Sequence, residues 1–482
     1  MKQKSKIIIV GGGTAGLVSA LLIKRRFQNV NIEIVKSQKI GIIGVGEGST
    51  ENFTDFVRSC NLDENELINR SDATIKGGIL FLNWYKDMYF YNVDKRFTDI
   101  KIGQYNGGYS YNYAYDLPHF DTTTRYLAQN LINPNVKVNQ YHFNTFKLNE
   151  YLIEVCKNRN IKITDDEIVD VSVDDDGISK LKGEKDEYVA DFYIDSTGFK
   201  KILISKLGAK WQSYGKYLKM NQAIAFPTED TDAYNTYSLA RAMKYGWMWR
   251  TPTNGRWGNG YIFNNTYIDS KQAQEEIEGV FGRPVNIFKD IKFDPGSLDK
   301  VWIKNCLAIG LSANFLEPLH ATSIGSVISQ VMLFTYYYFN YNQKTIDNFN
   351  DKANKNMIMM RDFICLHYNV KKYDSQFWID LHNIELPDTL KDKLNIWQDR
   401  FPIADDFSDN DYSLFYDQHW SNVLSAMEIP NRDTIRQELE SMNKNDVNWI
   451  RDKVNNFTNL INNEGANAIA HKSYLQNIRS NI

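Results

Sequence analysis

Three glycines near the start of the chain have the spacing of a dinucleotide-binding turn. The pattern G-x-G-x-x-G follows the apolar run 7–10 directly and precedes a helical pattern over 17–27. The first glycine permits a tight turn, the second lets backbone approach a pyrophosphate, and the third lets helix and strand pack closely. The helix N-terminus offers free N–H donors to the phosphates, although a plain glycine-rich turn would share the pattern. The residues expected at the cofactor are Gly11, Gly13, Thr14, Ala15 and Gly16.

The next strand lacks the acidic residue that usually binds the adenosine ribose at its end. Val35, Lys36 and Ser37 occupy that place, and Glu33 alternates to the side of the strand opposite Lys36. We therefore expect ribose recognition by Lys36, Ser37 or the backbone.

Residues 190–198 form a second stretch of the kind found in flavoproteins. The run Ala-Asp-Phe-Tyr-Ile-Asp-Ser-Thr-Gly predicts a buried strand that ends in Asp195 and a turn of small residues. FAD enzymes place such a turn near the ribityl chain and the pyrophosphate, but a purely structural strand and turn has the same pattern. Together, the two stretches favour FAD over NAD as the cofactor.

The segment 246–252, Gly-Trp-Met-Trp-Arg-Thr-Pro, resembles the G-W-x-W-x-I-P signature of flavin-dependent tryptophan halogenases. Thr251 replaces the usual isoleucine of that signature. Two lone tryptophans would by default be core residues, but further segments resemble the same family in the same order. These are 44–49 (the strap between flavin and substrate), 76–84, 305–319 and 361–378. The chain is therefore identified as a divergent member of this family, which uses FAD as FADH2, O2 and a halide ion.

The resemblance implies that Lys76 is the catalytic residue. In this family, reduced flavin, O2 and halide yield hypohalous acid, which a buried lysine holds by hydrogen bond or captures as a haloamine. Lysine suits this task because its amine is a compact donor whose pKa falls readily on burial. A single lysine is usually a solvated surface residue, but Gly77, Gly78 and the apolar run after them, together with the resemblance, favour the catalytic role here.

The resemblance also assigns residues to the halide and to the flavin. Trp247 and Trp249 would wall the space beside the flavin and keep the substrate away from it. The backbone N–H groups of Thr322 and Ser323 would hold chloride or bromide without adding a counter-charge. Further cofactor contacts are expected from Lys36, Glu47, Val169, Asp195 and Leu311.

One departure from the family lies at residues 318–323, where Pro-Leu-Glu-Ser-Thr-Gly becomes Pro-Leu-His-Ala-Thr-Ser. The family's glutamate is expected to assist the lysine or to take the ring proton. His320 could act as the base instead, since the ordinary pKa of histidine is about 6.5. Alternatively, His320 is structural and the proton leaves to water. Glu317 belongs to the family's own Glu-Pro-Leu and is not the missing carboxylate.

Three other functions remain open at this point. An FAD-dependent aromatic hydroxylase would share the fold, but it needs neither the tryptophan pair nor the lysine segment. A non-catalytic flavin-binding relic would explain the replaced acidic residues, but Lys76 and both tryptophans are retained. A flavoprotein reductase acting on a polyprenyl-type substrate is a weaker option.

The expected substrate is a small electron-rich aromatic compound of the indole or phenol type. The altered site and the Tyr/Asn-rich stretch 103–115, which we expect to be a loop over the site, argue against free tryptophan. A second fingerprint for NADH is not visible, so a separate flavin reductase is expected to supply FADH2. Regiochemistry, halide preference and oligomeric state stay open.

Composition excludes several classes of protein. The 482 residues carry a net charge of −3 and no basic tract, which argues against nucleic acid as a partner. The four cysteines have no paired spacing, which indicates a reducing cytoplasm and neither disulfides nor a metal site. No apolar run reaches about 18 residues, so no membrane span is expected.

The elements that must position these residues indicate an α/β (α+β) fold. The runs 7–10 and 31–35 predict parallel strands on either side of the helix, and 169–173 and 188–194 predict later strands. We expect a Rossmann-type FAD module interleaved with an antiparallel substrate sheet over residues 1–335. A mainly helical region would follow over residues 336–482, where Asn, Asp and Lys recur at helical spacing.

Overall fold

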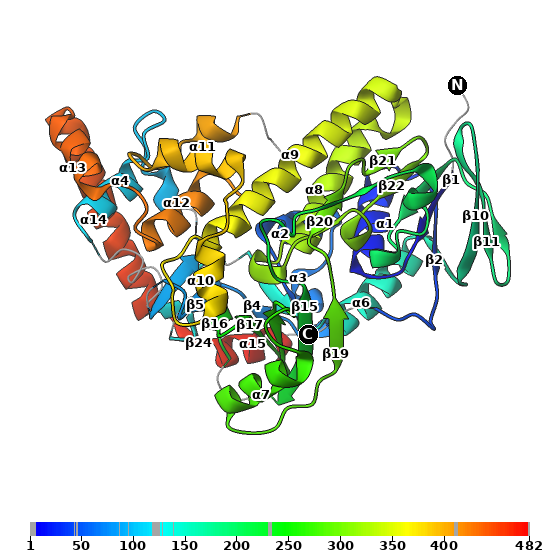
Figure 1. The fold of residues 1–482 in the computed structure, drawn as a ribbon, viewed down its shortest axis with the longest axis horizontal. Helices are drawn as coiled ribbons and strands as arrows, with labels where there is room; N and C mark the ends of the chain where they lie inside the picture. The colour runs from blue at the N-terminus through cyan, green and yellow to red at the C-terminus, as the bar shows by residue number, and fades with distance from the viewer. Residues whose placement is uncertain are drawn as a thin grey trace. The chain divides into compact units, whose positions relative to one another are not determined.

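Two units, interleaved along the chain, make up the computed structural model (Figure 1). Unit 1 comprises Met1–Ala73, Phe143–Leu218 and Phe293–Met357, and unit 2 comprises Thr74–His142, Lys219–Lys292 and Ile358–Ile482. The sequence predicts a single boundary after residue 335. The observed partition differs, because each unit is assembled from three chain segments. The structure describes residues 6–42, 44, 47–85, 87–94, 96–117, 126–127, 129–137, 139–229, 234–408 and 413–480.

A six-stranded sheet forms the core of unit 1. Four of its neighbouring pairs are parallel, and only the edge strand β21 is antiparallel. Ile7, Ile8 and Ile9 have no exposed surface, as expected of a central parallel strand covered on both faces. The strands, in sheet order, are β21 (Trp302–Ile303), β22 (Cys306–Ala308), β13 (Phe192–Asp195), β1 (Lys6–Val10), β2 (Asn31–Lys36) and β9 (Lys162–Asp165).

The helices of unit 1 begin with α1 (Thr14–Arg26), which packs against α6 (Thr145–Asn158) and α8 (Thr322–Tyr337) through buried apolar residues such as Leu17 and Leu21. The other helices are α2 (Glu51–Ser59), α3 (Glu64–Arg70), η2 (Gly198–Lys200), η3 (Ile204–Leu207), η4 (Gly310–Ser312), η5 (Pro318–His320) and η6 (Tyr338–Asn340).

Smaller strands complete unit 1. One three-stranded sheet has the order β10-β11-β12, and its long β10–β11 hairpin is visible in Figure 1. A second three-stranded sheet has the order β14-β20-β23. Their bounds are β3 (Glu47–Gly48), β10 (Ile168–Asp174), β11 (Gly177–Gly183), β12 (Glu187–Tyr188), β14 (Trp211–Ser213), β20 (Gly296–Leu298) and β23 (Asn314–Phe315). The predicted strand 188–194 is thus two strands, β12 and β13, and Asp191 between them accepts a hydrogen bond from the Lys6 N–H.

A seven-stranded, mainly antiparallel sheet is the centre of unit 2. Only β16 and β5 pair in parallel. The strands, in sheet order, are β19 (Lys289–Lys292), β15 (Gln222–Glu229), β18 (Arg256–Phe263), β17 (Gly246–Thr253), β16 (Tyr237–Met243), β5 (Gly78–Leu82) and β6 (Met88–Asn92). Together, the two sheets confirm the expected fold class.

The remaining elements of unit 2 are mostly helices. They are η1 (Arg96–Asp99), α4 (Gly107–Ala114), α7 (Ser270–Phe281), α10 (Gln376–His382), α11 (Asp388–Trp397), η7 (Ala404–Phe407), α12 (Asp417–Ala426), α13 (Arg432–Ser441), α14 (Lys444–Ala466) and α15 (His471–Ser480). The 26-residue helix α9 (Gln343–Tyr368) belongs to both units. The short strands are β4 (Thr74–Ile75), β7 (Leu131–Ile132), β8 (Tyr141–Phe143) and β24 (Ile469–Ala470).

The expectation of a loop over residues 103–115 is wrong, because residues 107–114 form α4. Tyr109 and Tyr113, one helical turn apart, are both buried. A Cβ on Gly107 would lie 2.8 Å from the Ile450 Cδ1, so the glycine permits close packing against α14. Burial of this face therefore outweighs the poor helix propensity of Gly, Asn and Tyr.

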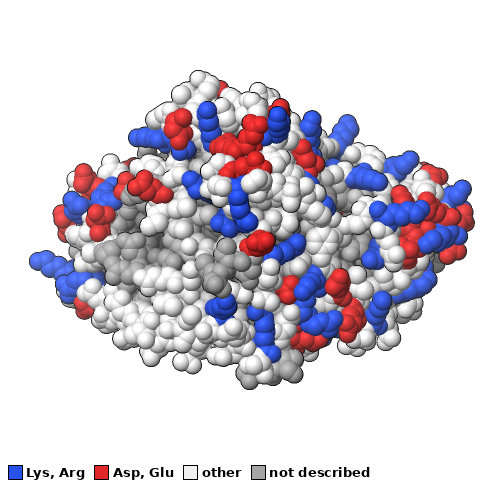
Figure 2. Space-filling view, turned by 90° about the horizontal axis from the view of Figure 1, so that it is seen from below, with Lys and Arg blue, Asp and Glu red and all other residues white. Residues whose placement is uncertain are grey.

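Charged side chains of both signs are interspersed on the face that Figure 2 shows. Among the described helices, none is long and apolar enough to cross a membrane.

Candidate active site

The glycine-rich turn of unit 1 has a geometry that other residues could not adopt. Gly11 has φ +115°, and a Cβ there would lie 2.1 Å from the Ser196 carbonyl oxygen. A Cβ on Gly16 would lie 2.1 Å from the Gly11 carbonyl oxygen. Since β1 pairs in parallel with β13, with Val10 opposite Asp195, the two stretches predicted to bind FAD lie side by side at one sheet edge.

The N-terminus of α1 opens beside this turn with free donors. Gly13 is its N-cap, and no side chain in the part of the chain that the structure describes caps the helix. The Thr14 hydroxyl donates to the Asn149 Oδ1 at 2.8 Å, while the buried Asn149 Nδ2 has no partner among the described residues. A pyrophosphate would satisfy both the helix N–H groups and this amide, so the residues present fit an FAD dinucleotide. Asn149 was not predicted, because it lies 135 residues from Thr14 in the sequence.

Asp195 is fully buried, and its carboxylate accepts hydrogen bonds from five donors among the described residues. They are the N–H and hydroxyl of Thr197, the N–H groups of Leu203 and Ile204, and the Ser312 hydroxyl, at 2.7 to 3.0 Å. The carboxylate therefore orders the turn after β13 and joins it to η4, which contains the half-buried Leu311.

At the end of β2, the side chain of Lys36 lies against the glycine turn. A Cβ on Gly12 would lie 2.5 Å from the Lys36 Cδ. Glu33 is engaged elsewhere, with ion pairs to Lys6 at 3.2 Å and Lys162 at 2.8 Å. Burial would raise the pKa of Glu33, but hydrogen bonds from Lys162, Thr164 and Lys6 hold it below its usual value.

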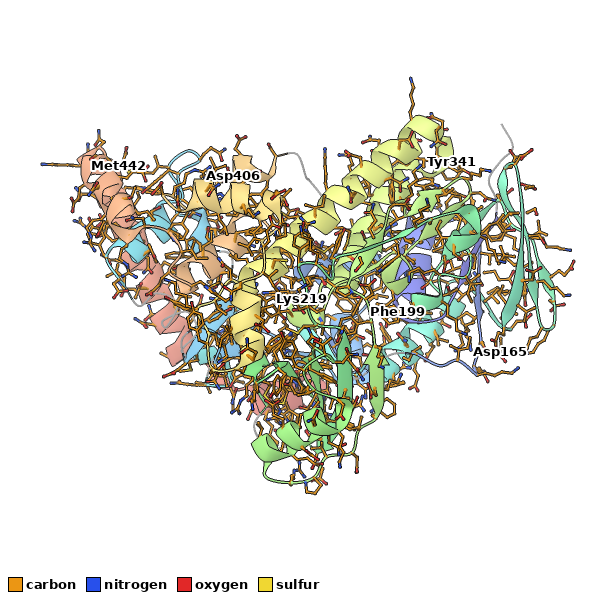
Figure 3. All side chains as sticks on the ribbon, viewed as in Figure 1. Asp165, Phe199, Lys219, Tyr341, Asp406 and Met442 are labelled. Atoms are coloured by element: carbon orange, nitrogen blue, oxygen red, sulfur yellow. The ribbon has the colours of Figure 1, made fainter. Side chains whose placement is uncertain are left out.

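Asp165, labelled in Figure 3, supplies an acidic residue on the neighbouring strand. It pairs with Lys36 in the sheet register, and its Oδ1 accepts the Gln38 N–H at 2.9 Å. This backbone hydrogen bond lowers the pKa of the Asp165 carboxyl, which keeps it charged. Val169 lies in β10 and is 54% exposed.

Glu47 lies in β3, and burial raises the pKa of its carboxyl to about 7. Of the strap predicted over 44–49, residues 45 and 46 lie outside the described residues.

The segment expected to bind halide leads into the N-terminus of α8. Thr322 and Ser323 are its first residues, and Ala321 precedes them in the left-handed conformation with φ +54°. Among the described residues, no side chain caps this helix, so its first N–H groups are available to an anion. His320 is buried in η5, immediately before this turn.

In unit 2, Lys76 is 2% exposed between β4 and β5. Its N–H donates to the Gln140 carbonyl at 2.9 Å, and the Gly77 N–H donates to the Thr236 carbonyl at 2.6 Å. A Cβ on Gly78 would lie 2.4 Å from the Tyr91 carbonyl oxygen, so the chain packs too closely here for other residues. Burial lowers the pKa of the Lys76 amine to about 7, so a large neutral fraction exists at neutral pH.

The two tryptophans of the signature lie in β17, in the same unit as Lys76. Trp247 is 1% exposed and its ring centroid lies 6.2 Å from that of the partly exposed Trp249. A Cβ on Gly260, opposite Trp249 in the sheet, would lie 1.9 Å from the indole. The ring of Trp249 therefore lies across a position that must be glycine.

The predicted site residues thus fall into two groups. Unit 2 contains Lys76, Trp247 and Trp249. Unit 1 contains all the others, which are the glycine turn, Lys36, Glu47, Val169, Asp195, Leu311, His320, Thr322 and Ser323. Two buried histidines near Lys76, His142 and His471, were not predicted because they come from distant segments. Within the described part of the chain, no group of three His, Cys, Asp or Glu side chains could hold a metal ion.

Comparison with known proteins assigns the family. The family model for tryptophan halogenase matches residues 6–440. The 7-chloro-L-tryptophan 6-halogenase KtzR of Kutzneria sp. is 28% identical over 444 residues, which cover 82% of this chain and 85% of that protein.

Two solved structures have the same fold. The crystal structure of a tryptophan halogenase from Shewanella frigidimarina superposes with a TM-score of 0.89 at 23% identity, over 99% of this chain and 98% of that one. BrvH, a flavin-dependent halogenase from Brevundimonas sp., superposes with a TM-score of 0.85 at 23% identity, over 98% of this chain and 99% of that one. The chain therefore belongs to the tryptophan halogenase family, and the expectation of an enzyme that uses FADH2, O2 and halide for flavin-dependent halogenation is confirmed.

Proposed function

We propose that this enzyme halogenates a small electron-rich aromatic compound of the indole or phenol type, and that Lys76 delivers the halogen. The observation that carries the proposal is the burial of Lys76 together with the lowered pKa of its amine. A neutral amine can accept a halogen on its lone pair, whereas an ammonium group can only donate hydrogen bonds. A buried amine with a pKa near 7 has access to both forms at neutral pH.

Bound FADH2 would react with O2 and halide to supply hypohalous acid. The glycine turn, the first N–H groups of α1 and the Asn149 amide would hold the dinucleotide phosphates. In place of the acidic residue missing from β2, the Asp165 carboxylate would accept hydrogen bonds from the adenosine ribose hydroxyls, and the Lys36 amine would donate to them. The first N–H groups of α8, at Thr322 and Ser323, would hold the halide.

Further roles follow for the other site residues. We assign Asp195 the ordering of the loop around the flavin, since protein donors occupy both of its oxygens. Trp247 and Trp249 would separate the substrate from the flavin. His320 is proposed to take the ring proton in place of the family's glutamate.

The substrate class rests on chemistry shared with relatives. KtzR acts on 7-chloro-L-tryptophan, so an indole ring is one substrate of this scaffold. His320 replaces the family's glutamate in the segment 318–323, and with this altered site we propose an indole or phenol rather than free tryptophan. A separate flavin reductase would supply FADH2.

The test supplies the purified protein with FAD, a flavin reductase, NADH, O2 and bromide, together with a panel of indoles and phenols. Catalase is included to remove hydrogen peroxide. The expected result is a product with the paired isotope peaks of one bromine atom. A gain of one oxygen without bromine would contradict the proposal and identify an aromatic hydroxylase.

A further inference from the structure

A set of buried polar side chains surrounds the segment that carries Lys76. Thr74, His142 and His471 are 0 to 1% exposed, and all three belong to unit 2. We call these three residues the histidine brace. They connect β4, which ends one residue before Lys76, to β8, β17 and α15.

The hydrogen bonds of Thr74 define the tautomer of His142. The Thr74 hydroxyl donates its proton to the Pro252 carbonyl at 2.8 Å. Its oxygen can then only accept from the His142 Nδ1, 3.0 Å away, so Nδ1 carries the proton. The His142 Nε2 is left as an acceptor for the Ser238 hydroxyl at 2.9 Å. His142 is therefore satisfied as a neutral imidazole.

His471 is fixed in the same tautomer by the backbone. The Ile75 N–H donates to the His471 Nε2 at 3.1 Å, which requires an unprotonated Nε2. Nδ1 then carries the proton and donates to the Tyr234 carbonyl at 2.9 Å. A proton on Nε2 would make this atom a donor facing the Ile75 N–H donor, and would break its hydrogen bond to the residue next to Lys76.

Groups that can carry a positive charge act on the brace from the Lys76 segment and from α15. Lys76 and His471 act on His142, and Arg479 acts on His471. All are cations when protonated, so each would repel a second positive charge here. The brace thus offers the Lys76 segment fixed hydrogen bonds from neutral side chains.

Pro252 makes the brace relevant to the reaction. It lies in β17, the strand that carries Trp247 and Trp249. The Thr74 hydroxyl therefore ties the strand before Lys76 to the strand of the tryptophan pair. Parts of the chain separated by 178 residues meet at this one hydrogen bond.

We propose that Thr74, His142 and His471 are positioning residues that hold the Lys76 amine in register with the tryptophan strand, so that the halogen reaches the substrate and is not lost to solvent. This inference rests on the proposed role of Lys76. The brace would thereby couple the formation of hypohalous acid to the halogenation of the ring.

The test uses two separate variants. Thr74→Val removes the hydroxyl and keeps the shape of the side chain. In His142→Asn, the amide can still donate toward Thr74. Thr253→Val is the matched control, because Thr253 is 1% exposed and its hydroxyl donates to the Arg256 carbonyl within its own hairpin. Three quantities are measured: halogenated product per FADH2 consumed, hypohalous acid trapped by a soluble β-diketone, and the labelling rate of Lys76 by a small acylating reagent.

For Thr74→Val, product per FADH2 should fall by about tenfold to a hundredfold while trapped hypohalous acid rises, because a small displacement of a reacting group is enough for such a loss. The labelling rate of Lys76 should change, and FADH2 consumption should not. Thr253→Val should match the wild type. Adding Thr74→Val to Lys76→Ala should cause no further loss of product, since the brace acts through Lys76.

Thr74→Val and His142→Asn proteins that fold and couple as the wild type does would overturn the inference. So would an additive loss in the double variant, which would indicate a general structural role. Failure of the underlying function looks different, because Lys76→Ala alone would then still give full product in the presence of the trap.

Discussion

At the scale of single residues, the proposed function depends on the buried amine of Lys76. Its amine has a pKa of about 7 in the folded protein and an ordinary value of 10.5, so the unfolded chain binds the extra proton between these pH values. The contribution of Lys76 to stability is therefore unfavourable at pH 7 and disappears as pH rises toward 10.5. A buried, desolvated amine of this kind fits a reactive role better than a structural one.

Lys76→Met should consequently stabilise the fold at pH 7. Met keeps the length and removes the titrating group, so the free energy of unfolding should rise by up to about 4 kcal/mol. Denaturant unfolding at pH 7 and pH 10 measures the effect, and the gain should shrink at the higher pH. An equal difference at both values would show that burial does not depress the pKa of Lys76.

Asn149 should contribute directly to cofactor affinity. Asn149→Leu removes the buried Nδ2 donor beside the α1 N-terminus and should weaken FAD binding by about tenfold, the loss of about 1.4 kcal/mol. Flavin fluorescence titration measures the dissociation constant. Unchanged affinity in a folded variant would remove Asn149 from the phosphate site.

At the scale of elements, the turn between β1 and α1 must have glycine at position 11. Gly11→Ala should abolish FAD binding, because its Cβ would collide with the Ser196 backbone at a left-handed φ. Gly208→Ala is the control: Gly208 also has positive φ, +87°, but a Cβ there meets nothing within 4 Å. The control should lose about 1 kcal/mol of stability and keep its FAD affinity. Retained binding in Gly11→Ala would contradict the geometry of the turn.

The contact between β4 and α15 predicts a sensitivity to acid. Burial lowers the pKa of His471 to about 4, so its stabilising contribution is complete above pH 6.5 and is lost as pH falls toward 4. His471→Gln keeps an acceptor for the Ile75 N–H but does not titrate. Between pH 6.5 and 4, the free energy of unfolding should fall by about 3 kcal/mol less in this variant than in the wild type. Parallel curves for wild type and variant would contradict the neutral brace.

At the scale of the whole molecule, the sequence predicted what local patterns determine. The glycine turn and the parallel strands beside it follow from residues close together in the chain, whereas Lys76 was singled out through the family resemblance of its segment. The Asn149, His142 and His471 contacts do not, because they join segments 135, 68 and 396 residues apart. The two interleaved units, each built from three segments, could not be read from one boundary in composition. Helix α4 was missed because packing of its tyrosines, not propensity, stabilises it.

The most direct test of the account compares wild type with Lys76→Met in one reaction that contains FADH2, O2, bromide, an aromatic substrate and a trap for free hypobromous acid. Both proteins should consume FADH2 at similar rates. The wild type should place bromine on the substrate, whereas Lys76→Met should place it on the trap and lose substrate bromination by at least about a hundredfold. Equal bromination of the substrate by the two proteins would contradict the central role of Lys76.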